Sequence, residues 1–295
     1  MEIKILHVEA STYCNARCPL CPRNAHGYNV PGVYAEQHLS IENYKKALEK
    51  FPNLKFVYFN GNLGDPMMNP DILELAKISQ CYTNIFTNGS IGREETWKGL
   101  AQLMGEVTFS IDGLEDTNHL YRQDVDWNRL MQRIKWYIEA GGTAVWKWIK
   151  FKHNQHQIHE AKTLSKQLGF KTFDVVDHGR NYGPALNQKA EITHWILPAD
   201  GSKSPEEFNV QDKITRYKLN HDNWNEFKGK IDIACEHEIE QKVYVDVNGD
   251  LSPCCYQGFN LPNRKRIDLT EFQALKDTWS TTSCDKICAS TCGKS

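Results

Sequence analysis

The first 178 residues alternate short apolar runs, rich in β-branched and aromatic side chains, with longer segments whose apolar residues recur at helical spacing. Strands are predicted at residues 3–8, 54–59, 82–87, 107–111, 145–151 and 172–176. Helices are predicted from Ser40 onward and at residues 70–79, 127–140 and 157–168. Strands that alternate with helices form parallel sheets, so the pattern predicts an α/β fold.

The six predicted βα units are fewer than the eight of a closed barrel. The pattern therefore predicts an α/β sheet that is smaller than a closed eight-stranded barrel. In parallel βα folds the functional side chains gather at the carboxyl ends of the strands. The motifs of residues 1–178 that bear on chemistry are each expected to follow such a strand.

The rest of the chain divides into two further parts. Residues 179–232 lose the βα rhythm, contain several Gly and Pro residues, and are interpreted as a linker or covering segment. Residues 233–295 are rich in cysteine and are predicted to form a small C-terminal domain of hairpin and helix. Its hairpin begins with Val243–Val247, and the turn Asn248-Gly249-Asp250 follows.

Composition narrows the function classes. The 35 Lys and Arg residues nearly balance the 37 Asp and Glu residues, giving a formal charge of -2, which predicts no general affinity for nucleic acid or membrane. No apolar run approaches the roughly 18 residues of a spanning helix. Met1 leads into a strand pattern rather than a signal peptide, so a cytoplasmic protein is expected.

Nine of the ten cysteines fall into two groups, residues 14–21 and residues 235–292. Clustered thiols in a chain of this size without a secretory signal favour metal binding over disulfides, and imply a reducing compartment. Cys81 stands alone and is interpreted as a packed thiol.

The first group, Cys14, Cys18 and Cys21, has the spacing C-x3-C-x2-C directly after the first predicted strand. Three thiolates can hold three irons of a 4Fe-4S cubane and leave the fourth iron open. A metal with an open coordination position can bind and activate a substrate, so this spacing indicates catalysis. A zinc knuckle or unrelated loop cysteines are the alternatives.

This run resembles the signature of the radical S-adenosylmethionine (radical SAM) superfamily. The resemblance implies that the amino and carboxylate groups of SAM chelate the open iron. An electron from the reduced cluster then cleaves SAM to methionine and a 5′-deoxyadenosyl radical, which abstracts a substrate hydrogen. It also implies a partial (β/α)6 TIM-like barrel, which the six predicted βα units match, and an external electron donor such as flavodoxin or ferredoxin.

The resemblance extends to the segments that follow the later strands. Asn60, Gly61, Gly64 and Asp65 lie where the family has a Gly-Gly-Glu-Pro-like loop, although this chain has extra residues between the glycines and Asp in place of Glu. The other positions that the family uses to contact SAM match Thr87, Asn88, Ser110, Asp112, Arg122 and Asn154.

The C-terminal cysteines resemble the SPASM and twitch extensions, which hold auxiliary iron-sulfur clusters. Cys235 is followed by thirteen residues, Gly249, four residues and Cys254. Four ligands of a second cluster, expected to be 4Fe-4S, would come from Cys235, Cys254, Cys284, Cys288 and Cys292. Cys255 is expected to point elsewhere. A zinc site with four cysteines is the alternative.

A small-molecule substrate is favoured, for oxidation or rearrangement, because no peptide-recognition segment is seen before the first strand. A radical SAM maturase acting on a peptide from a partner is the alternative. A different class, a zinc-binding scaffold with a degenerate barrel, is supported by the altered glycine loop. Nucleic-acid binding through Trp146 and Trp148 is a distant further reading, since aromatic residues at strand spacing more often lie in a core.

Overall fold

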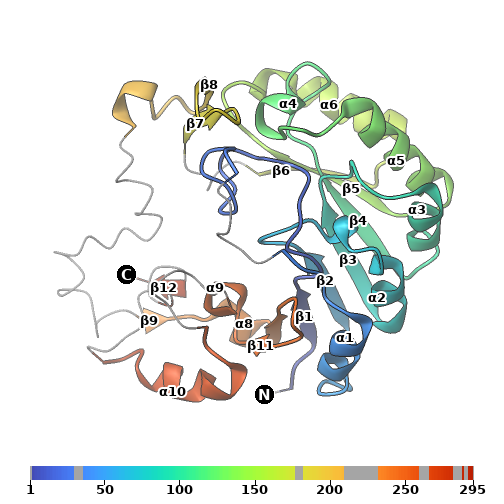
Figure 1. Cartoon of the computed structure of the whole chain (residues 1–295), viewed down its shortest axis with the longest axis vertical. Helices are drawn as coiled ribbons and strands as arrows, with labels where there is room; N and C mark the ends of the chain where they lie inside the picture. Colours follow the sequence, from blue (N-terminus) through green and yellow to red (C-terminus); the bar gives the residue numbers. More distant parts are fainter. Residues whose placement is uncertain are drawn as a thin grey trace.

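The centre of the protein is one eight-stranded sheet, seen in a computed structural model that describes residues 2–29, 36–176, 182–208, 232–258, 266–281, 288 and 292–294. The strand order is β11-β10-β1-β2-β3-β4-β5-β6 (Figure 1). Neighbouring strands from β10 to β6 are parallel, and β11 is antiparallel to β10. The strands are β1 Ile5–Val8, β2 Phe56–Asn60, β3 Tyr82–Thr87, β4 Gly105–Ser110, β5 Ala144–Ile149, β6 Thr172–Val176, β10 Lys242–Val245 and β11 Leu251–Ser252.

The α/β fold with a partial barrel is therefore confirmed, and β1 to β6 lie within three residues of their predicted bounds. The helices of this part of the chain cover the convex face of the sheet (Figure 1). They are α1 Ile41–Leu48, α2 Ile72–Ile78, α3 Glu94–Leu100, α4 Asn118–Tyr121, α5 Trp127–Glu139 and α6 Ile158–Leu168, with the 3-10 turns η1 Pro66–Met68 and η2 Gln155–Gln157.

Capping residues fix where these helices begin and end. Ser40 accepts a hydrogen bond from the Asn43 N–H at 3.1 Å, which starts α1 as predicted. Asp126 accepts from the Arg129 N–H at 2.7 Å and starts α5. Gly169 adopts φ +91° and ends α6, a left-handed conformation that glycine allows at little cost.

Large aromatic side chains fill the layer between sheet and helices. Trp97 of α3 stacks on Phe109 of β4, with 5.4 Å between ring centroids. Trp146 and Trp148 of β5 are both 0% exposed, and the Trp146 indole donates to the Ile111 carbonyl at 3.0 Å. These two tryptophans are core residues, which excludes them as surface platforms for nucleic-acid bases.

The concave face of the sheet carries polar side chains. Leu6 and Val8 of β1 are 0% exposed within the core, so the alternation of a strand directs His7 and Glu9 to the opposite face. The same face on β2 presents Tyr58 and Asn60, which are half-buried. The concave side is therefore the polar side, with the carboxyl ends of the strands at one rim.

The C-terminal hairpin is part of the main sheet. β10 lies directly beside β1, with Leu6 opposite Val243 and His7 opposite Tyr244. The sequence predicts a hairpin at this place but not its pairing with the first strand. Next to it lie α8 Glu236–Ile239 and α9 Cys255–Gly258, followed by η5 Leu269–Glu271 and α10 Phe272–Asp277. Two short strands, β9 Asp232–Ile233 and β12 Gly293–Lys294, pair antiparallel.

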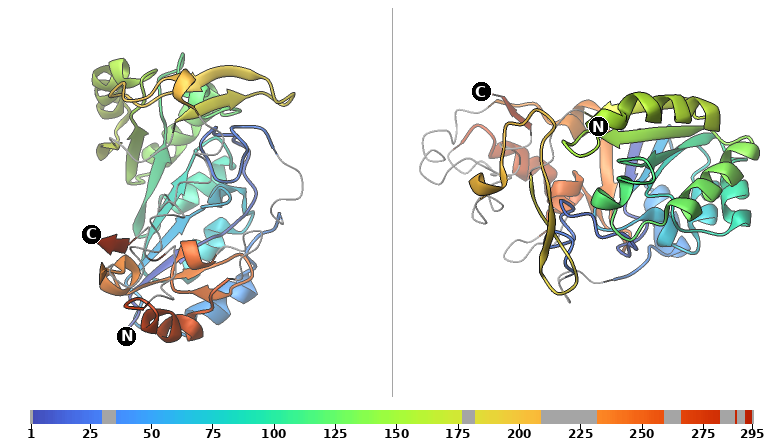
Figure 2. Two further views of the ribbon diagram at one scale, coloured as in Figure 1. Left: turned by 90° about the vertical axis from the view of Figure 1, so that its left-hand side faces the viewer. Right: turned by 90° about the horizontal axis from the view of Figure 1, so that it is seen from above.

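A second hairpin occupies the described part of residues 179–232, which the sequence suggests to be a linker with little core. It consists of β7 Gly183–Leu186 and β8 Ile192–Ile196, with η3 Pro205–Glu207 after it. Figure 2 shows it as a two-stranded arm beside α4. The His194 Nε2 atom lies 2.8 Å from the Leu120 carbonyl oxygen, which ties the arm to the end of α4.

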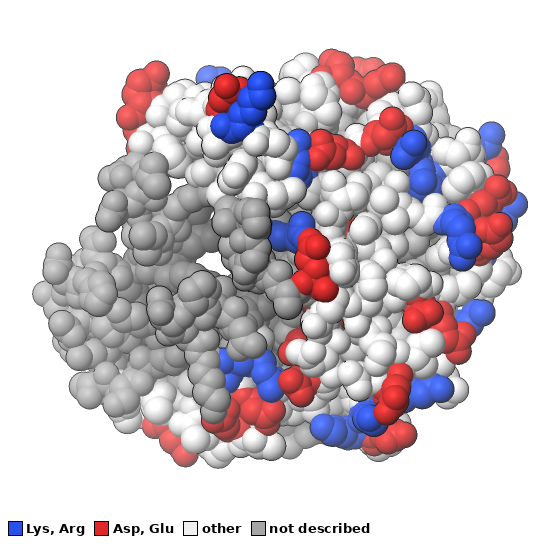
Figure 3. Space-filling view, viewed as in Figure 1, with Lys and Arg blue, Asp and Glu red and all other residues white. Residues whose placement is uncertain are grey.

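Surface charge is mixed on the face drawn in Figure 3, where acidic and basic side chains alternate over the described residues. This distribution agrees with the formal charge of -2 and offers no extended basic surface there. Within the described part of the chain, no helix combines the length and the apolar character needed to cross a membrane.

Candidate active site

The loop after β1 carries Cys14, Cys18 and Cys21 at the carboxyl end of that strand. The Cys21 N–H donates to the Cys18 carbonyl at 3.0 Å, forming a turn that keeps these two residues together. Two nitrogen donors reach the sulfur atoms from neighbouring loops. The Asn88 Nδ2 atom is 4.0 Å from the Cys14 Sγ atom, and the Arg122 Nη1 atom is 3.6 Å from the Cys18 Sγ atom.

These three thiols are electrostatically coupled. Burial raises the pKa of the Cys14 thiol, and Asp65, Cys18 and Cys21 raise it further. Burial also raises the pKa of the Cys18 thiol, whereas the neighbouring Arg122 lowers it. Thiolates buried together need a positive charge beside them, and iron supplies it when a cluster binds.

The surroundings of the three thiols are compatible with a 4Fe-4S cubane. Throughout the ranges that the structure describes, no three His, Cys, Asp or Glu side chains converge as ligands of one metal ion. A 4Fe-4S cluster requires no such convergence, because each thiolate binds its own iron. Donors aimed at the sulfur atoms also match the environment that tunes iron-sulfur clusters. The residues present therefore fit the cluster that the sequence predicts.

The glycine loop after β2 lies against the cysteine loop. A Cβ atom on Gly64 would be 2.0 Å from the Ser11 carbonyl oxygen, and one on Gly61 would be 2.0 Å from the Gly64 carbonyl oxygen. Larger residues are therefore excluded at both positions, as the motif predicts. The Asp65 N–H donates to the Tyr13 carbonyl at 2.8 Å and joins the two loops.

Asp65 is 4% exposed, and its carboxylate links the loops after β2 and β3. It accepts from the Thr87 hydroxyl at 2.8 and 3.0 Å, from the Asn88 N–H at 2.8 Å and from the Met67 N–H at 2.9 Å. Burial raises the pKa of this carboxyl, and those donors lower it. Both oxygens are thus occupied within the protein, and contact between Asp65 and SAM stays a prediction.

Asp112 and Arg122 form a buried ion pair at the end of β4. Asp112 is 0% exposed, and its Oδ2 atom accepts from the Arg122 Nε–H at 2.7 Å. Its other oxygen accepts from the Ile149 N–H at 2.5 Å, which links β4 to β5. Because Arg122 also reaches Cys18, the pair connects two strand ends to the cysteine loop.

Asn154 is 0% exposed and braces the loop after β5. Its amide donates to the Asp112 and Ile149 carbonyls at 2.8 and 2.9 Å and accepts from the Phe151 N–H at 2.8 Å. Its amide is therefore engaged within the protein. Ser110, by contrast, is half-buried at the end of β4. The sequence-predicted residues gather at one rim, as the parallel sheet requires.

Glu9 is a residue of this rim that the motif comparison misses. It directly follows β1, is 1% exposed, and accepts hydrogen bonds from the backbone of the glycine loop and from the Tyr244 hydroxyl. The signal in the sequence was a carboxylate placed immediately after a buried strand. No motif marked it, because its partners are backbone atoms and a residue 235 positions away.

Four cysteines line one cavity of about 510 Å³ in the C-terminal region. They are Cys235, Cys254, Cys288 and Cys292. A hydrogen bond with Cys292, together with burial, raises the pKa of the Cys235 thiol. His237 also lines this cavity, is 7% exposed, and its Nδ1 atom has no hydrogen-bond partner among the residues that the structure describes. A buried unpaired nitrogen beside four thiols fits a cavity that takes a metal group.

Two further cysteines complete the comparison with the predicted ligand set. Cys284 lies outside the described residues. Cys255 is buried and is absent from the cavity lining, and burial raises the pKa of its thiol to about 12. Cys255 begins α9 instead of lying in the extended strand that the sequence analysis assumed, and its role as a non-ligand stays a prediction.

Comparison with known proteins identifies the family. Residues 8–174 match the family model described as the radical SAM superfamily, a range that runs from the end of β1 into β6 and includes all three cysteines of the first group. The chain belongs to the radical SAM superfamily. Family membership implies a SAM-binding 4Fe-4S cluster and an enzymatic function.

The radical SAM chain is similar to a tungsten-containing aldehyde ferredoxin oxidoreductase cofactor-modifying protein of Pyrococcus furiosus. The two are 34% identical over 309 aligned positions, covering 94% of this chain and 81% of that protein. Streptococcus suis SuiB bound to S-adenosylmethionine has a similar fold, with a TM-score of 0.58 at 17% identity over 95% of this chain and 66% of SuiB.

Native anSMEcpe with bound AdoMet is also similar in fold. Its TM-score is 0.58 at 15% identity, covering 95% of this chain and 81% of anSMEcpe. Both structures support the partial barrel of the radical SAM chain, and their identities are too low to transfer a substrate. This chain spans slightly less than two thirds of SuiB.

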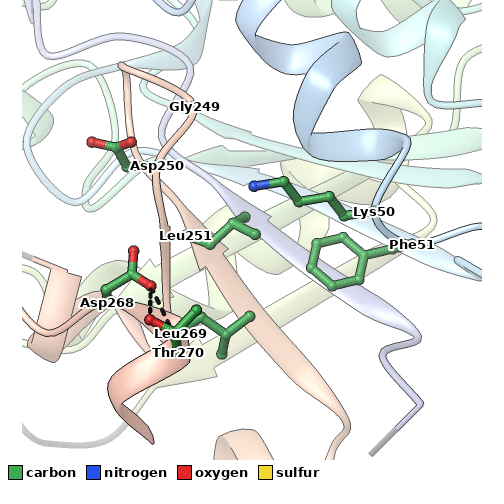
Figure 4. A pocket seen from close by; sticks show the side chains of 8 residues that line it. All are labelled: Lys50, Phe51, Gly249, Asp250, Leu251, Asp268, Leu269 and Thr270. Carbon is green, nitrogen blue, oxygen red and sulfur yellow. Dashed lines mark hydrogen bonds between the residues drawn. The ribbon is translucent and has the colours of Figure 1, made fainter.

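A second hollow, of about 310 Å³, lies between the end of α1 and the β10–β11 hairpin (Figure 4). Lys50, Phe51, Asp250 and Asp268 are among the residues that line it. The Asp268 carboxylate accepts from the Thr270 N–H and hydroxyl at 2.9 and 2.7 Å. No cysteine lines this hollow, which separates it from the candidate radical SAM site.

Proposed function

We propose that this chain reductively cleaves SAM and abstracts a hydrogen atom from a small-molecule substrate. The observation that carries the proposal is the loop of Cys14, Cys18 and Cys21, with donors from Asn88 and Arg122 directed at its sulfur atoms. When bound, the cluster and SAM supply the 5′-deoxyadenosyl radical. The three thiolates would hold the cluster, and the two donors would stabilise their negative charge.

The rest of the rim would shape the SAM pocket. Gly61 and Gly64 allow close approach of the backbone, and Ser110 presents a half-buried hydroxyl at the rim. Asp65, Asp112 and Asn154 hold the three loops after β2, β4 and β5 through buried hydrogen bonds. A rigid rim of this kind excludes water and keeps reacting groups in place.

A small-molecule substrate is supported by the Pyrococcus furiosus relative, whose described role is the modification of a cofactor. A peptide supplied by a partner is the second candidate. It is supported by fold neighbours solved with peptides, SuiB with the precursor SuiA and anSMEcpe with Cp18Cys, at 17% and 14% identity. We place the cofactor-like small molecule first because the 34% identical relative covers 94% of this chain.

We also propose that Cys235, Cys254, Cys288 and Cys292 bind an auxiliary iron-sulfur cluster, as in SPASM or twitch extensions. The proposal is supported by the four thiols that line one cavity and by the His237 Nδ1 atom beside them, which has no hydrogen-bond partner within the described part of the chain. A cluster fully ligated by protein would relay electrons or stabilise the C-terminal region. A soluble donor such as flavodoxin or ferredoxin would reduce the first cluster.

The decisive test is the formation of 5′-deoxyadenosine by protein reconstituted without oxygen, reduced and supplied with SAM. The Cys14, Cys18 and Cys21 triple-Ala variant is expected to produce none, and Cys81→Ala, a thiol outside both groups, is expected to match the wild type. Equal yields from wild type and triple variant would refute the proposal. A colourless protein that holds zinc in both cysteine groups would establish the scaffold reading instead.

The substrate class is tested by adding cell extract separated by ultrafiltration. A small-molecule substrate predicts that the filtrate accelerates 5′-deoxyadenosine formation. A peptide or protein substrate predicts that the retained fraction does so, and that protease treatment abolishes the effect. The triple-Ala variant serves as the blank for both fractions.

A further inference from the structure

The Glu9 carboxylate is enclosed by donors from a single loop. Its Oε2 atom accepts from the Asn62 N–H at 2.9 Å, and its Oε1 atom accepts from the Leu63 and Gly64 N–H groups, each at 3.2 Å. Three consecutive backbone N–H groups that face one anion form a nest. Glu9 is 1% exposed, so water does not replace these contacts.

This nest accounts for the unusual form of the glycine loop. Asn62 and Leu63 are the extra residues between Gly61 and Gly64, and their N–H groups belong to neither a helix nor a strand. Backbone N–H groups withdrawn from water need a partner, and Glu9 provides it. With the two inserted residues, the segment is a longer loop that encloses the Glu9 carboxylate instead of a compact glycine turn.

The loop is held at both ends. Glu9 fixes residues 62–64 from the side of β1, and Asp65 fixes the next position through Thr87 and Asn88 of β3 and its following loop. Loss of either carboxylate would therefore release one side of a segment that lies beside the cysteine loop.

The C-terminal hairpin completes this arrangement. The Tyr244 hydroxyl of β10 donates to the Glu9 Oε2 atom at 3.1 Å, and Tyr244 is 1% exposed. Its ring also packs edge-on against His7, with 5.3 Å between ring centroids. Burial raises the pKa of Glu9 to about 7, while the backbone donors and Tyr244 lower it. Each donor thus favours the carboxylate form.

We propose that Glu9 is a positioning residue for SAM, and that Tyr244 braces it so that the C-terminal hairpin completes the SAM pocket. The proposal rests on the proposed radical SAM function. Glu9 would act through residues 62–64, keeping that loop beside the cysteines in the conformation that receives SAM. Neither Glu9 nor Tyr244 is required to touch SAM.

The test compares three variants of the full chain, reconstituted to equal iron content. Glu9→Gln keeps the side-chain size but turns an amide N–H₂ group toward backbone donors. Tyr244→Phe removes one hydroxyl and keeps the ring. Tyr58→Phe is the matched control, because Tyr58 lies on the same concave face, opposite His7 in the neighbouring strand.

Two readouts are independent of turnover. The first is the dissociation constant of SAM, measured by equilibrium dialysis and by the change that SAM causes in the electron paramagnetic resonance spectrum of the reduced cluster. The second is amide hydrogen exchange, by mass spectrometry, of a peptide covering residues 56–68. Melting temperature and iron content are recorded alongside.

Glu9→Gln is expected to weaken SAM binding by about tenfold or more, because hydrogen bonds to a charged group are lost. Tyr244→Phe is expected to weaken it by about threefold to tenfold, since one donor of four is removed. Both variants should speed exchange of the 56–68 peptide. Tyr58→Phe should leave both readouts at wild-type values.

The proposal is overturned if Glu9→Gln and Tyr244→Phe bind SAM as tightly as Tyr58→Phe. If Glu9→Gln fails to fold, Tyr244→Phe alone decides, and wild-type affinity in that variant again overturns it. Wild-type protein that holds its cluster but does not bind SAM would instead overturn the proposed radical SAM function. In that case, faster exchange of the 56–68 peptide in Tyr244→Phe would still establish the brace.

Discussion

Removing Arg122 tests how the rim is held together. In Arg122→Met the side chain keeps much of its length and loses its charge, so the carboxylate of Asp112 remains buried without its cation. Asp112 is 0% exposed, and among the described residues its carboxylate would keep the Ile149 backbone N–H as its one remaining donor. The substitution therefore leaves an uncompensated charge between β4 and β5.

The expected loss in the free energy of unfolding follows from the burial of Asp112. Removing one partner of a buried ion pair lowers stability by about 3–5 kcal/mol, because the remaining charge is shielded from water and no longer has an opposite charge beside it. The more exposed pair of Arg17 and Asp124 serves as the comparison, since 16% of the Arg17 side chain and 48% of the Asp124 side chain are exposed. A pair of that kind contributes about 0–1 kcal/mol.

The assay is the free energy of unfolding in urea, with Asp124→Asn as the matched surface control. The double variant Asp112→Asn, Arg122→Met should recover part of the loss, because a neutral amide replaces the stranded carboxylate. A cost for Arg122→Met no larger than that of Asp124→Asn would refute the reasoning. So would a double variant whose loss equals the sum of the two single losses.

Two further outcomes are expected. Cys254→Ala should lower the iron content of the reconstituted protein by the iron of one cluster, whereas Cys255→Ala should leave the iron content unchanged. Iron analysis of both variants tests this, and equal losses of iron would contradict the ligand assignment. Burial lowers the pKa of His7 to about 4, so the unfolded chain, with a pKa near 6.5, binds the proton first as the pH falls. Stability is therefore lost below about pH 6.5, by about 2 kcal/mol at about pH 5. In urea titrations, His7→Gln should flatten that decline; an unchanged pH profile would contradict it.

Local patterns predicted the barrel well, because each strand and helix carries its own period. The bounds of β3 and β6 agree with the sequence analysis, and Ser40 and Gly169 act as the expected caps. The cysteine and glycine motifs were also local, so their gathering at one rim followed from strand direction alone. These features require no knowledge of distant contacts.

The remaining features depend on pairing across the chain. Nothing in residues 242–245 indicates that they lie beside β1, because a parallel pairing has no turn to mark it. The hydrogen-bond partners of Glu9 could not be predicted from the sequence either. Its donors are backbone N–H groups, which no side-chain motif marks, and Tyr244, which is far away along the chain. The hydrogen bonds of Asp65 with Thr87 and Asn88 are likewise set by tertiary packing and have no local signal in the sequence.

The pairing of β10 with β1 determines when the sheet is completed during synthesis of the chain. On the ribosome, β1 pairs with β2 early, but its other edge waits for residues 242–245, which are synthesised much later. Until then the growing chain presents an open sheet edge, the feature through which unfinished proteins stick to one another. A nascent chain that stalls before β10 therefore leaves the edge of β1 unpaired and lacks the Tyr244 hydroxyl that holds Glu9, so we expect it to be bound by chaperones.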